Sequence, residues 1–414
     1  MTDKLKANSF LTLCKTCDYI INIPNANGER YKCPICKSHL KSSLGIDFRS
    51  LSIMALSSLI ILFVSIFQPF ISVSTLGISH TIELVSLVFV LKTDWSLLLY
   101  FLFLFTFFFP IIMLSIIVLI GLFNIKPNIY IAKVYSISYS FCMVDVFLIG
   151  VLVSLIKLTS LSFVNFHSGF VLGILFTIML LYCFIKCPPY RVWDLILVSD
   201  IKKEHEGYRG IDVDLILCTH CLHHFYTKDY NAVCPRCKSI VSKRDRVYFQ
   251  KIVALLIAAL TLYLPSNIYP IMYTDYLGNN IGSNIIEGVI SLWGMHSWFV
   301  AIVILFASIF IPIFKIISIA FLLYTTRHTD IKKPLYLTHL YKIVLFIGKW
   351  SMIDVFVVII MTSVVRFSGL LVINPGFAIV TFCMVVIITM FAAESFDQRL
   401  IWDNSINGYK KIKR

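Results

Sequence analysis

Residues 96–121 read SLLLYFLFLFTFFFPIIMLSIIVLIG, a stretch of 26 residues that contains no charged side chain. A helix needs about 20 such residues to cross the hydrocarbon core of a bilayer. The whole chain is 58% hydrophobic and only 14% charged, whereas soluble domains carry about 25% charged residues. Seven further apolar runs have a similar length: residues 51–71, 134–157, 169–187, 251–273, 298–325, 342–366 and 373–394. We therefore predict an all-α polytopic membrane protein with eight transmembrane helices.

Most Lys and Arg residues lie on one predicted side of the membrane. Of the 36, 31 fall in residues 1–50, 122–133, 186–251, 326–342 and 395–414. By the positive-inside rule, this places both termini and the central linker in the cytoplasm. Residues 1–50 lack the apolar core of a cleavable signal peptide, so the N-terminus is expected to stay inside. Topology and attraction to anionic lipid head groups account for the net charge of +14, and we expect no nucleic-acid partner.

Eight cysteines form two four-cysteine modules. Each module has two CxxC pairs, separated by 15 residues in the first and 12 in the second: Cys14, Cys17, Cys33 and Cys36, then Cys218, Cys221, Cys234 and Cys237. This spacing is typical of zinc ribbons, in which four thiolates complete a tetrahedral site. Iron in a rubredoxin-like site and disulfides are the alternatives, and a reducing cytosol disfavours disulfides. A closed four-thiolate site leaves no position for substrate, so we expect two structural zinc ions and no enzymatic activity.

The chain contains two copies of one unit. Motifs recur in the same order at an offset of 201 to 209 residues, so that Gln68-Pro69 returns as Tyr269-Pro270, MVDVF at 143–147 as MIDVF at 352–356, and YRVWD at 190–194 as RLIWD at 399–403. Each copy has an even number of spans, so the copies are expected to run parallel about an axis near the membrane normal. We predict a β zinc ribbon at 1–48, a four-helix transmembrane unit at 49–200, a second ribbon at 201–247 and a second four-helix unit with a cytoplasmic tail at 248–414.

Three ionisable residues lie deep in predicted spans, where their cost makes them functional candidates. They are Asp145, Lys315 and Asp354. On helical spacing, hydroxyl residues share faces with these charges or with one another, which predicts a polar seam that includes Ser308, Ser351 and Thr389. The alternative is an interhelical ion pair and hydroxyl bonds that only hold the bundle together. In the first copy the position that matches Lys315 lies near Met113, so Asp145 has no evident cation and the first site is expected to be degenerate.

The cysteine pairs, the stretch KWSMIDVF at 349–356 and the stretch FDQRLIWD at 396–403 together resemble the paraquat-inducible protein A family, including its lipophilic envelope-spanning tunnel A branch. The resemblance spans nearly the whole chain. Two departures are Gln398, where the family has proline, and SFCM at 140–143, where a tryptophan-containing version is usual. The resemblance implies an inner-membrane protein that works with a periplasmic MCE-domain tunnel protein to move lipids between membranes. It also implies that the family's intramembrane polar network corresponds to Lys315, Asp354, Ser308, Ser351 and Thr389.

These observations lead to one functional hypothesis and two rivals. The hypothesis is an inner-membrane transporter that exchanges phospholipids with the MCE tunnel and so supports envelope integrity. The chain has no GxxxxGK[ST] nucleotide-binding loop, so energy would come from a partner or an ion gradient, with Asp354 and Lys315 as the proton-responsive pair. The rivals are a redox or electron-transfer protein that uses the four-cysteine metal sites, and a scaffold that anchors the tunnel without transporting lipid.

Overall fold

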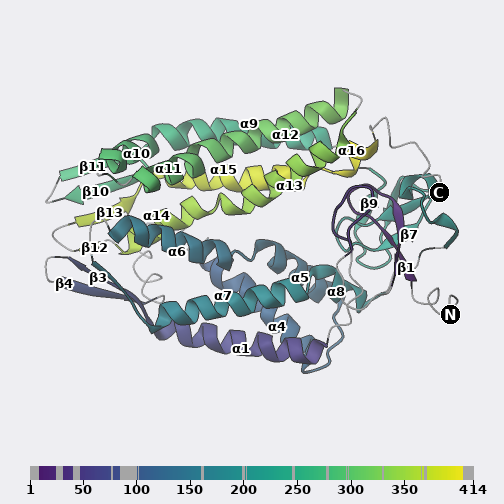
Figure 1. Cartoon of the computed structure of the whole chain (residues 1–414), viewed down its shortest axis with the longest axis horizontal. Coiled ribbons are helices and arrows are strands. Elements are labelled where there is room, and N and C mark those ends of the chain that lie inside the picture. The colour runs from purple at the N-terminus through teal and green to yellow at the C-terminus, as the bar shows by residue number, and fades with distance from the viewer. Residues whose placement is uncertain are drawn as a thin grey trace.

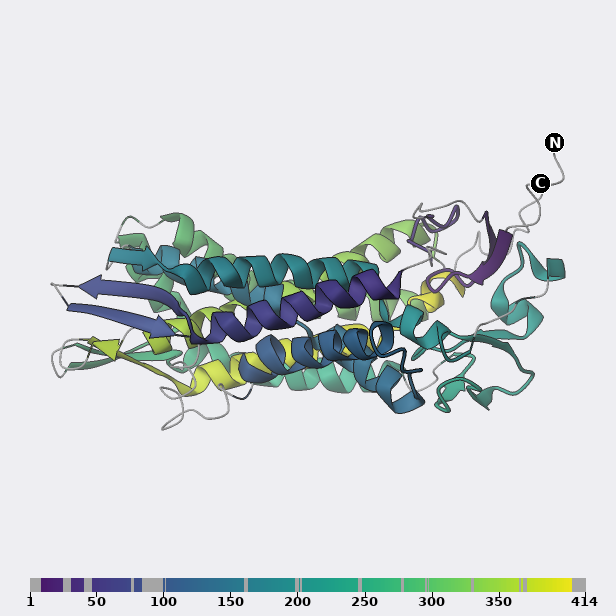
Figure 2. The same ribbon diagram turned by 90° about the horizontal axis from the view of Figure 1, so that it is seen from below.

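The computed structural model describes residues 9–24, 31–40, 47–75, 78–83, 100, 102–159, 163–197, 201, 203–244, 248–276, 279–294, 296, 298–328, 331–364, 366–367 and 371–403. Within these residues, eight helices are long and apolar enough to cross a membrane. The long helices lie side by side along the longest axis of the molecule (Figures 1 and 2). The cysteine modules lie at one end of this bundle and two small β-sheets at the other. The chain is therefore a multi-pass membrane protein, and the predicted fold class is confirmed.

The first helical unit runs from α1 to α8. Its elements are α1 (Phe48–Phe67), β3 (Pro69–Thr75), β4 (Ile78–Glu83), the π-helix η2 (Leu104–Phe108), α4 (Phe109–Gly121), α5 (Ile129–Phe141), α6 (Val144–Thr159), β5 (Phe163–Phe166), α7 (Ser168–Lys186) and α8 (Pro189–Asp194). The three strands form an antiparallel sheet in the order β4-β3-β5, in which Ser72 pairs with Thr81 on one side and Asn165 on the other. This sheet joins α1, α6 and α7 at the end of the bundle that lies away from the cysteine modules.

The second helical unit repeats this order. It consists of α9 (Tyr248–Ile268), β10 (Met272–Tyr276), β11 (Asn279–Ser283), α10 (Ile285–Gly294), α11 (Trp298–Leu305), the π-helix η5 (Phe306–Phe310), α12 (Ile311–His328), α13 (Pro334–Trp350), α14 (Ile353–Val364), β12 (Arg366–Phe367), β13 (Leu371–Pro375), α15 (Phe377–Glu394) and α16 (Arg399–Asp403). Its antiparallel sheet has the order β11-β10-β13-β12. In each unit a hairpin follows the first span and a further strand precedes the last span, so the predicted repeat extends to the strands.

The β-sheets correct several predicted helix ends. Residues 69–71, 272–273, 366 and 373–375 were predicted to be helical, yet they lie in β3, β10, β12 and β13. The residue before a proline is forced away from helical geometry, and Gln68, before Pro69, has φ −90° and ψ 146°. Pro69 also lacks the amide hydrogen that would continue the helix. The apolar run therefore continues past the point at which the helix stops.

Two of the predicted spans are broken helices. The third span is divided between α5 and α6, and the seventh between α13 and α14. Cys142 is extended at the first break, with φ −71° and ψ 112°. Asp145 and Asp354 each occupy the second position of the helix that follows a break. The structure thus places both MxDVF motifs at the start of a half-helix, where backbone amides point toward the break.

Both units carry a π-helical turn before a proline. The turn η2 leads into Pro110, and the turn η5 leads into Pro312. A proline ring clashes with the carbonyl four residues earlier, and a wider turn relieves that clash. A π-helical turn rotates the residues beyond it, which changes the faces expected from regular α-helical spacing. Thr106 and Ser308 occupy equivalent positions in the two turns.

The helical units meet mainly along α6 and α14. The rings of Phe147 and Phe356 pack edge to face, with centroids 5.8 Å apart. Gly150 permits this approach, because an added Cβ there would lie 3.0 Å from the Cβ of Phe356. Ser154 Oγ donates to the carbonyl oxygen of Gly150 at 2.7 Å and lies 3.4 Å from that of Val357 across the interface. A glycine and a hydroxyl therefore allow close packing between the copies.

The cysteine modules consist of short hairpins. Module 1, residues 9–40, contains β1 (Ser9–Leu13) and β2 (Ile20–Pro24), and module 2, residues 203–244, contains η3 (Lys203–His205), η4 (Gly210–Val213), β6 (Leu215–Leu217), β7 (His224–Tyr226), β8 (Asn231–Val233) and β9 (Ile240–Ser242). Each hairpin pair is antiparallel. The modules also pack on each other, with Leu13 and Ile20 in one buried cluster with Leu215 and Leu217.

The packing of the modules on the helical units is crossed, in that each buried cysteine cluster includes residues of the helical unit that does not follow its module in sequence. The four cysteines of module 1 share a buried cluster with Ile252 of α9 and Trp402 of α16, both in the second unit. Lys342 of α13 donates to Ser38 Oγ at 2.8 Å. The cysteines of module 2 instead share a cluster with Trp193 of α8, which ends the first unit. Each module therefore packs on the helical unit that does not follow it in sequence.

Candidate metal centres and intramembrane polar residues

The two CxxC pairs of module 1 bring four sulfurs together. Cys14 Sγ lies 3.5 Å from Cys36 Sγ, and Cys17 Sγ lies 3.6 Å from Cys33 Sγ. Each pair forms a tight turn that closes with a backbone bond to the first cysteine's carbonyl, from Asp18 at 3.0 Å and from Lys37 at 2.9 Å. Both of these residues have positive φ, of 61° and 56°. The turns therefore aim both sulfurs of each pair at one point.

Module 2 has the same geometry. Its sulfurs lie 3.6 Å apart between Cys218 and Cys237 and also between Cys221 and Cys234. Leu222 and Lys238 take the positive-φ positions after the first cysteine pair and the second. All eight cysteines are buried. The repeat thus extends to the backbone conformation of each turn.

Both sulfur clusters fit a metal ion. In each module the four sulfurs lie within 4.8 Å of one another. Four sulfurs at 2.3 Å from a central zinc would have edges of about 3.8 Å, close to the measured separations. The cysteines are free thiols, because the closest described sulfurs are 3.5 Å apart and a disulfide requires about 2.05 Å. The two groups can therefore each hold one ion, in a site whose four positions are all filled by protein.

Charged residues join module 1, module 2 and the C-terminal helix α16. Arg244, at the end of module 2, donates to Asp18 at 2.8 Å and to Asp403 at 2.6 Å. Arg209 also pairs with Asp403. Asp18 directly follows the first cysteine pair, so this network connects the metal-binding turn of module 1 to the end of the second unit. All four side chains are at least four-fifths buried.

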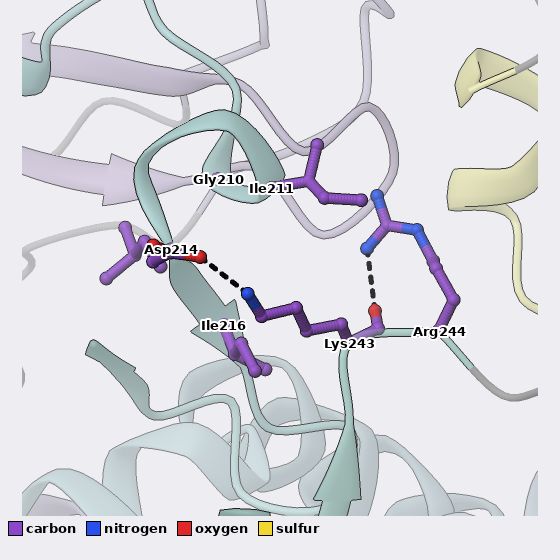
Figure 3. A pocket seen from close by; sticks show the side chains of 7 residues that line it. Gly210, Ile211, Asp214, Ile216, Lys243 and Arg244 are labelled. Atoms are coloured by element: carbon purple, nitrogen blue, oxygen red, sulfur yellow. Dashed lines mark hydrogen bonds and ion pairs between the residues drawn. The ribbon is translucent and has the colours of Figure 1, made fainter. Parts of the chain in front are cut away.

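Figure 3 shows the neighbouring seam between η4 and β9. Lys243 Nζ donates to Asp214 at 2.5 Å, and Arg244 Nη1 donates to the carbonyl oxygen of Lys243 at 2.9 Å. Gly210 lies on the opposite wall, and its amide donates to the carbonyl oxygen of Asp18 at 2.7 Å. The backbone of module 2 is thus bonded to the metal-binding turn of module 1.

Lys315 and Ser351 meet inside the second helical unit. Lys315 lies near the start of α12 and is completely buried. Its Nζ donates to Ser351 Oγ at 3.3 Å, and Ser351 lies at the break between α13 and α14. The structure therefore brings these two residues of the predicted seam together. Their contact lies where the helix is interrupted, which the sequence did not indicate.

The other predicted members of the seam take different positions. Ser308 is buried in the π-helical turn η5. Thr389 is buried in α15, and its hydroxyl donates to the carbonyl oxygen of Val386 in the same helix at 2.9 Å. The side chain of Asp354 lies outside the described residues, so the predicted pairing of Lys315 with Asp354 stays a prediction. The start of α14, which contains Asp354, adjoins Ser351.

Asp145 has a cation partner, which corrects our expectation that it has none. Lys349 Nζ of α13 lies 3.0 Å from Asp145 Oδ2 of α6, and both side chains are about 30% exposed. Lys349 Nζ also lies 5.3 Å from the ring centroid of Phe184. The cation comes from the other unit, so a search at the equivalent position of the same copy could not find it. The sequence does contain a signal for this partner, because Lys349 is a lysine within the apolar run just before MIDVF.

The sequence was compared with known proteins. The family profile described as paraquat-inducible protein A matches residues 48–196 and 249–405, once over each helical unit. Intermembrane transport protein PqiA of Escherichia coli strain K12 is 34% identical over 399 residues, which cover 94% of this chain and 95% of that protein. A probable intermembrane transport protein of Haemophilus influenzae is 29% identical, covering 96% and 97% of the two chains.

A third relative, lipophilic envelope-spanning tunnel protein A of Escherichia coli strain K12, is 25% identical and covers 95% of this chain and 92% of its own. No solved structure matches the chain. The profile matches each helical unit separately, in agreement with the duplicated architecture of the structure. On these grounds, the chain belongs to the paraquat-inducible protein A family.

Proposed function

We propose that this protein is an inner-membrane transporter that exchanges phospholipids with a periplasmic MCE-domain tunnel protein. The observation that carries the proposal is its similarity, over nearly its whole length, to relatives named for intermembrane transport and for an envelope-spanning tunnel. With both termini in the cytoplasm, as the distribution of Lys and Arg predicts, the cysteine modules are cytoplasmic and the two β-sheets face the periplasm. The proposed partner would then meet the sheet end of the molecule.

The polar site in the second unit would bind the lipid head group. A buried lysine inside a membrane is costly and usually functional. Lys315 contacts Ser351 at the break before α14, and a half-helix that starts inside a membrane presents a positive end. A lysine and a helix N-terminus at one point favour a phosphate group. We propose that Asp354, in the first turn of α14, responds to protons and controls how strongly Lys315 attracts that phosphate.

The broken helix supplies a place for movement. Residues at a break can change φ and ψ without disrupting long runs of helical hydrogen bonds. Ser351 links the break to α12 through Lys315, so a lipid that displaces this bond would free α13 and α14 to move relative to α12. The Asp145–Lys349 pair joins the equivalent break in the first unit to the end of α13, so movement of α13 would also have to break this pair. We therefore propose that the second unit carries the moving site.

Each cysteine module would bind one zinc ion in a structural role. Four thiolates leave no free coordination position, and the crossed packing gives each module a mechanical role. Purified protein that contains two zinc ions and lacks visible absorption would support this proposal. An absorption spectrum typical of iron in a four-thiolate site would favour electron transfer instead.

The proposal can be tested in cells whose resistance to detergent or bile salt depends on this protein. Lys315→Ala and Asp354→Asn should each abolish the resistance at normal expression. Lys251→Ala, which removes an exposed lysine of α9, is the matched control and should retain it. Full resistance in both the Lys315 and Asp354 variants would contradict the assigned role.

A further inference from the structure

The helix α10 follows the sheet of the second unit and is too short to cross a membrane, since it has 10 residues. Its start is fixed by two reciprocal bonds. Glu287 N donates to Asn284 Oδ1 at 2.9 Å, and Asn284 N donates to Glu287 Oε2 at 3.0 Å. Val289 packs against Ala301 of α11 in one buried cluster. The helices α10 and α11 therefore form a packed pair at the sheet end of the bundle (Figure 1).

Three large apolar side chains of α10 are exposed on one face. Ile286, Ile290 and Trp293 follow one another at helical spacing, and each is between 49% and 65% exposed. Glu287 and Ser291 lie about 100° further around the helix and form an exposed polar face. Single exposed apolar residues are ordinary, whereas a contiguous group marks a surface that binds another molecule or a membrane. The exposed apolar face of α10 is such a group.

The level of α10 along the bundle follows from its distance to the end of α9. The helix α9 has 21 residues, so it is about 31 Å long and matches the hydrocarbon core of a bilayer. Tyr263 Oη donates to the carbonyl oxygen of Ile309 at 3.3 Å, which puts these two residues at a similar level. From there toward the sheets, Ile268 at the end of α9 is about 8 Å away and Ala301 is about 12 Å away. The contact of α10 with Ala301 therefore lies about 5 Å outside the hydrocarbon core, among the lipid head groups.

The exposed face of α10 continues a lipid-facing stripe of the next span. Trp298, Ile302 and Phe306 follow one another at intervals of four residues, and each is at least 44% exposed. The last two belong to a candidate membrane span. The ring of Trp298, at the outer end of this stripe, stacks on the ring of Trp293 with centroids 6.0 Å apart. Tryptophan concentrates at the boundary between the hydrocarbon core and water, which is the level expected for this pair.

We propose that the apolar face of α10 inserts among the membrane phospholipids at the sheet end of the second unit. A periplasmic protein is the competing occupant, but Figure 1 shows β10 and β11 extending beyond α10, so a partner that approaches from water would meet these strands first. The inference rests on the proposed function only in calling this leaflet the outer one. The contact with lipid does not depend on transport, and it leaves the strands as the surface for an MCE-domain partner.

Site-specific photo-crosslinking of the full chain in nanodiscs of phosphatidylethanolamine and phosphatidylglycerol tests this contact. The variants are Ile290→p-benzoylphenylalanine on the apolar face and Ser291→p-benzoylphenylalanine on the polar face, and lipid adducts are quantified by mass spectrometry. Both residues are exposed and adjacent in sequence, so Ser291 is the matched control. We expect about five-fold more lipid adduct from the probe at Ile290, because the polar face of an interfacial helix points toward water. Ile286→p-benzoylphenylalanine repeats the measurement one turn earlier on the same apolar face.

Lipid adducts no more abundant at Ile290 and Ile286 than at Ser291 would overturn the proposal. The purified soluble part of an MCE-domain partner, added to the same nanodiscs, separates the two occupants. We expect the lipid adducts at Ile290 to persist when this partner is present. Their replacement by crosslinks to the partner would also overturn the proposal and would make α10 a protein-docking surface. Lipid adducts at Ile290 in a protein that fails to transfer lipid would remove the transport proposal and leave this contact standing.

Discussion

Replacing Asp403 by asparagine should release module 2 from α16 of the second helical unit. Asp403 of α16 pairs with both Arg209 and Arg244, and its side chain is 20% exposed. Breaking a buried ion pair typically costs about 3–5 kcal/mol, because the remaining charge is left buried. Arg244 would keep Asp18 at 2.8 Å, which offsets part of this loss. We therefore expect Asp403→Asn to weaken the contact by about 2 kcal/mol.

Limited proteolysis of module 2 in detergent measures this effect. When opening is fast relative to cleavage, the cleavage rate follows the open population, so about 2 kcal/mol corresponds to about 30-fold faster cleavage. Asp214→Asn is the control, since its pair with Lys243 is half-exposed and should change the rate no more than about five-fold. Equal cleavage rates for Asp403→Asn and Asp214→Asn would refute the coupling between module 2 and α16.

Three further predictions follow from the geometry of the metal sites, the unit interface and the C-terminal segment. Cys218→Ser should lower the metal content measured by mass spectrometry from two ions to one per chain, because the modules are separate sites. Gly150→Val should lower the thermal stability and separate α6 from α14, since even a Cβ there lies 3.0 Å from that of Phe356; an unchanged melting temperature would contradict this interface. Burial opposes the ionisation of Asp397, but the attraction and hydrogen bonds of Arg399 and the attraction of Arg244 together outweigh it, so the pKa of Asp397 is lowered. Its stabilising effect should be complete above the ordinary carboxyl pKa of about 3.9 and be lost as the pH falls through the lowered value, so Asp397→Asn should destabilise the protein at pH 7 but not in strong acid.

The spans and cysteine turns could be predicted because their signals are local. The composition of a run such as residues 96–121 is enough to predict a membrane span. The sulfurs of two CxxC pairs require only short turns to converge on one ion. The strand β3 was missed because Ile71 and Val73 continue the apolar run of α1, and only Pro69 marks the change. Hydrophobicity alone cannot distinguish the end of a buried helix from the start of an apolar strand.

The crossed modules and the Asp145–Lys349 pair could not be predicted, because both depend on contacts between the copies. Asp145 and Lys349 are 204 residues apart, and the repeat directs attention to the equivalent position in the same copy. Trp402 could equally have packed against either module on sequence grounds, since Trp193 is its repeat. The structure assigns Trp402 to module 1 and Trp193 to module 2.

The break at Ser351 shows why helical spacing alone was a weak guide to the polar seam. A regular helix would place Ser351 and Asp354 on one face. The interruption between α13 and α14 instead makes Ser351 the end of one helix and Asp354 part of the start of the next. Residues with weak helical signals, such as a serine before MIDVF, do not reveal such a break in an otherwise apolar run.

The most direct test of the central claim is lipid transfer from reconstituted protein. Proteoliposomes with a labelled phospholipid would be combined with the purified soluble part of an MCE-domain partner and unlabelled acceptor vesicles. We predict that the wild-type protein accelerates transfer and that Lys315→Ala removes the acceleration, while Lys251→Ala retains it. Transfer by Lys315→Ala at the wild-type rate would contradict the claim that the buried lysine at the helix break handles the lipid.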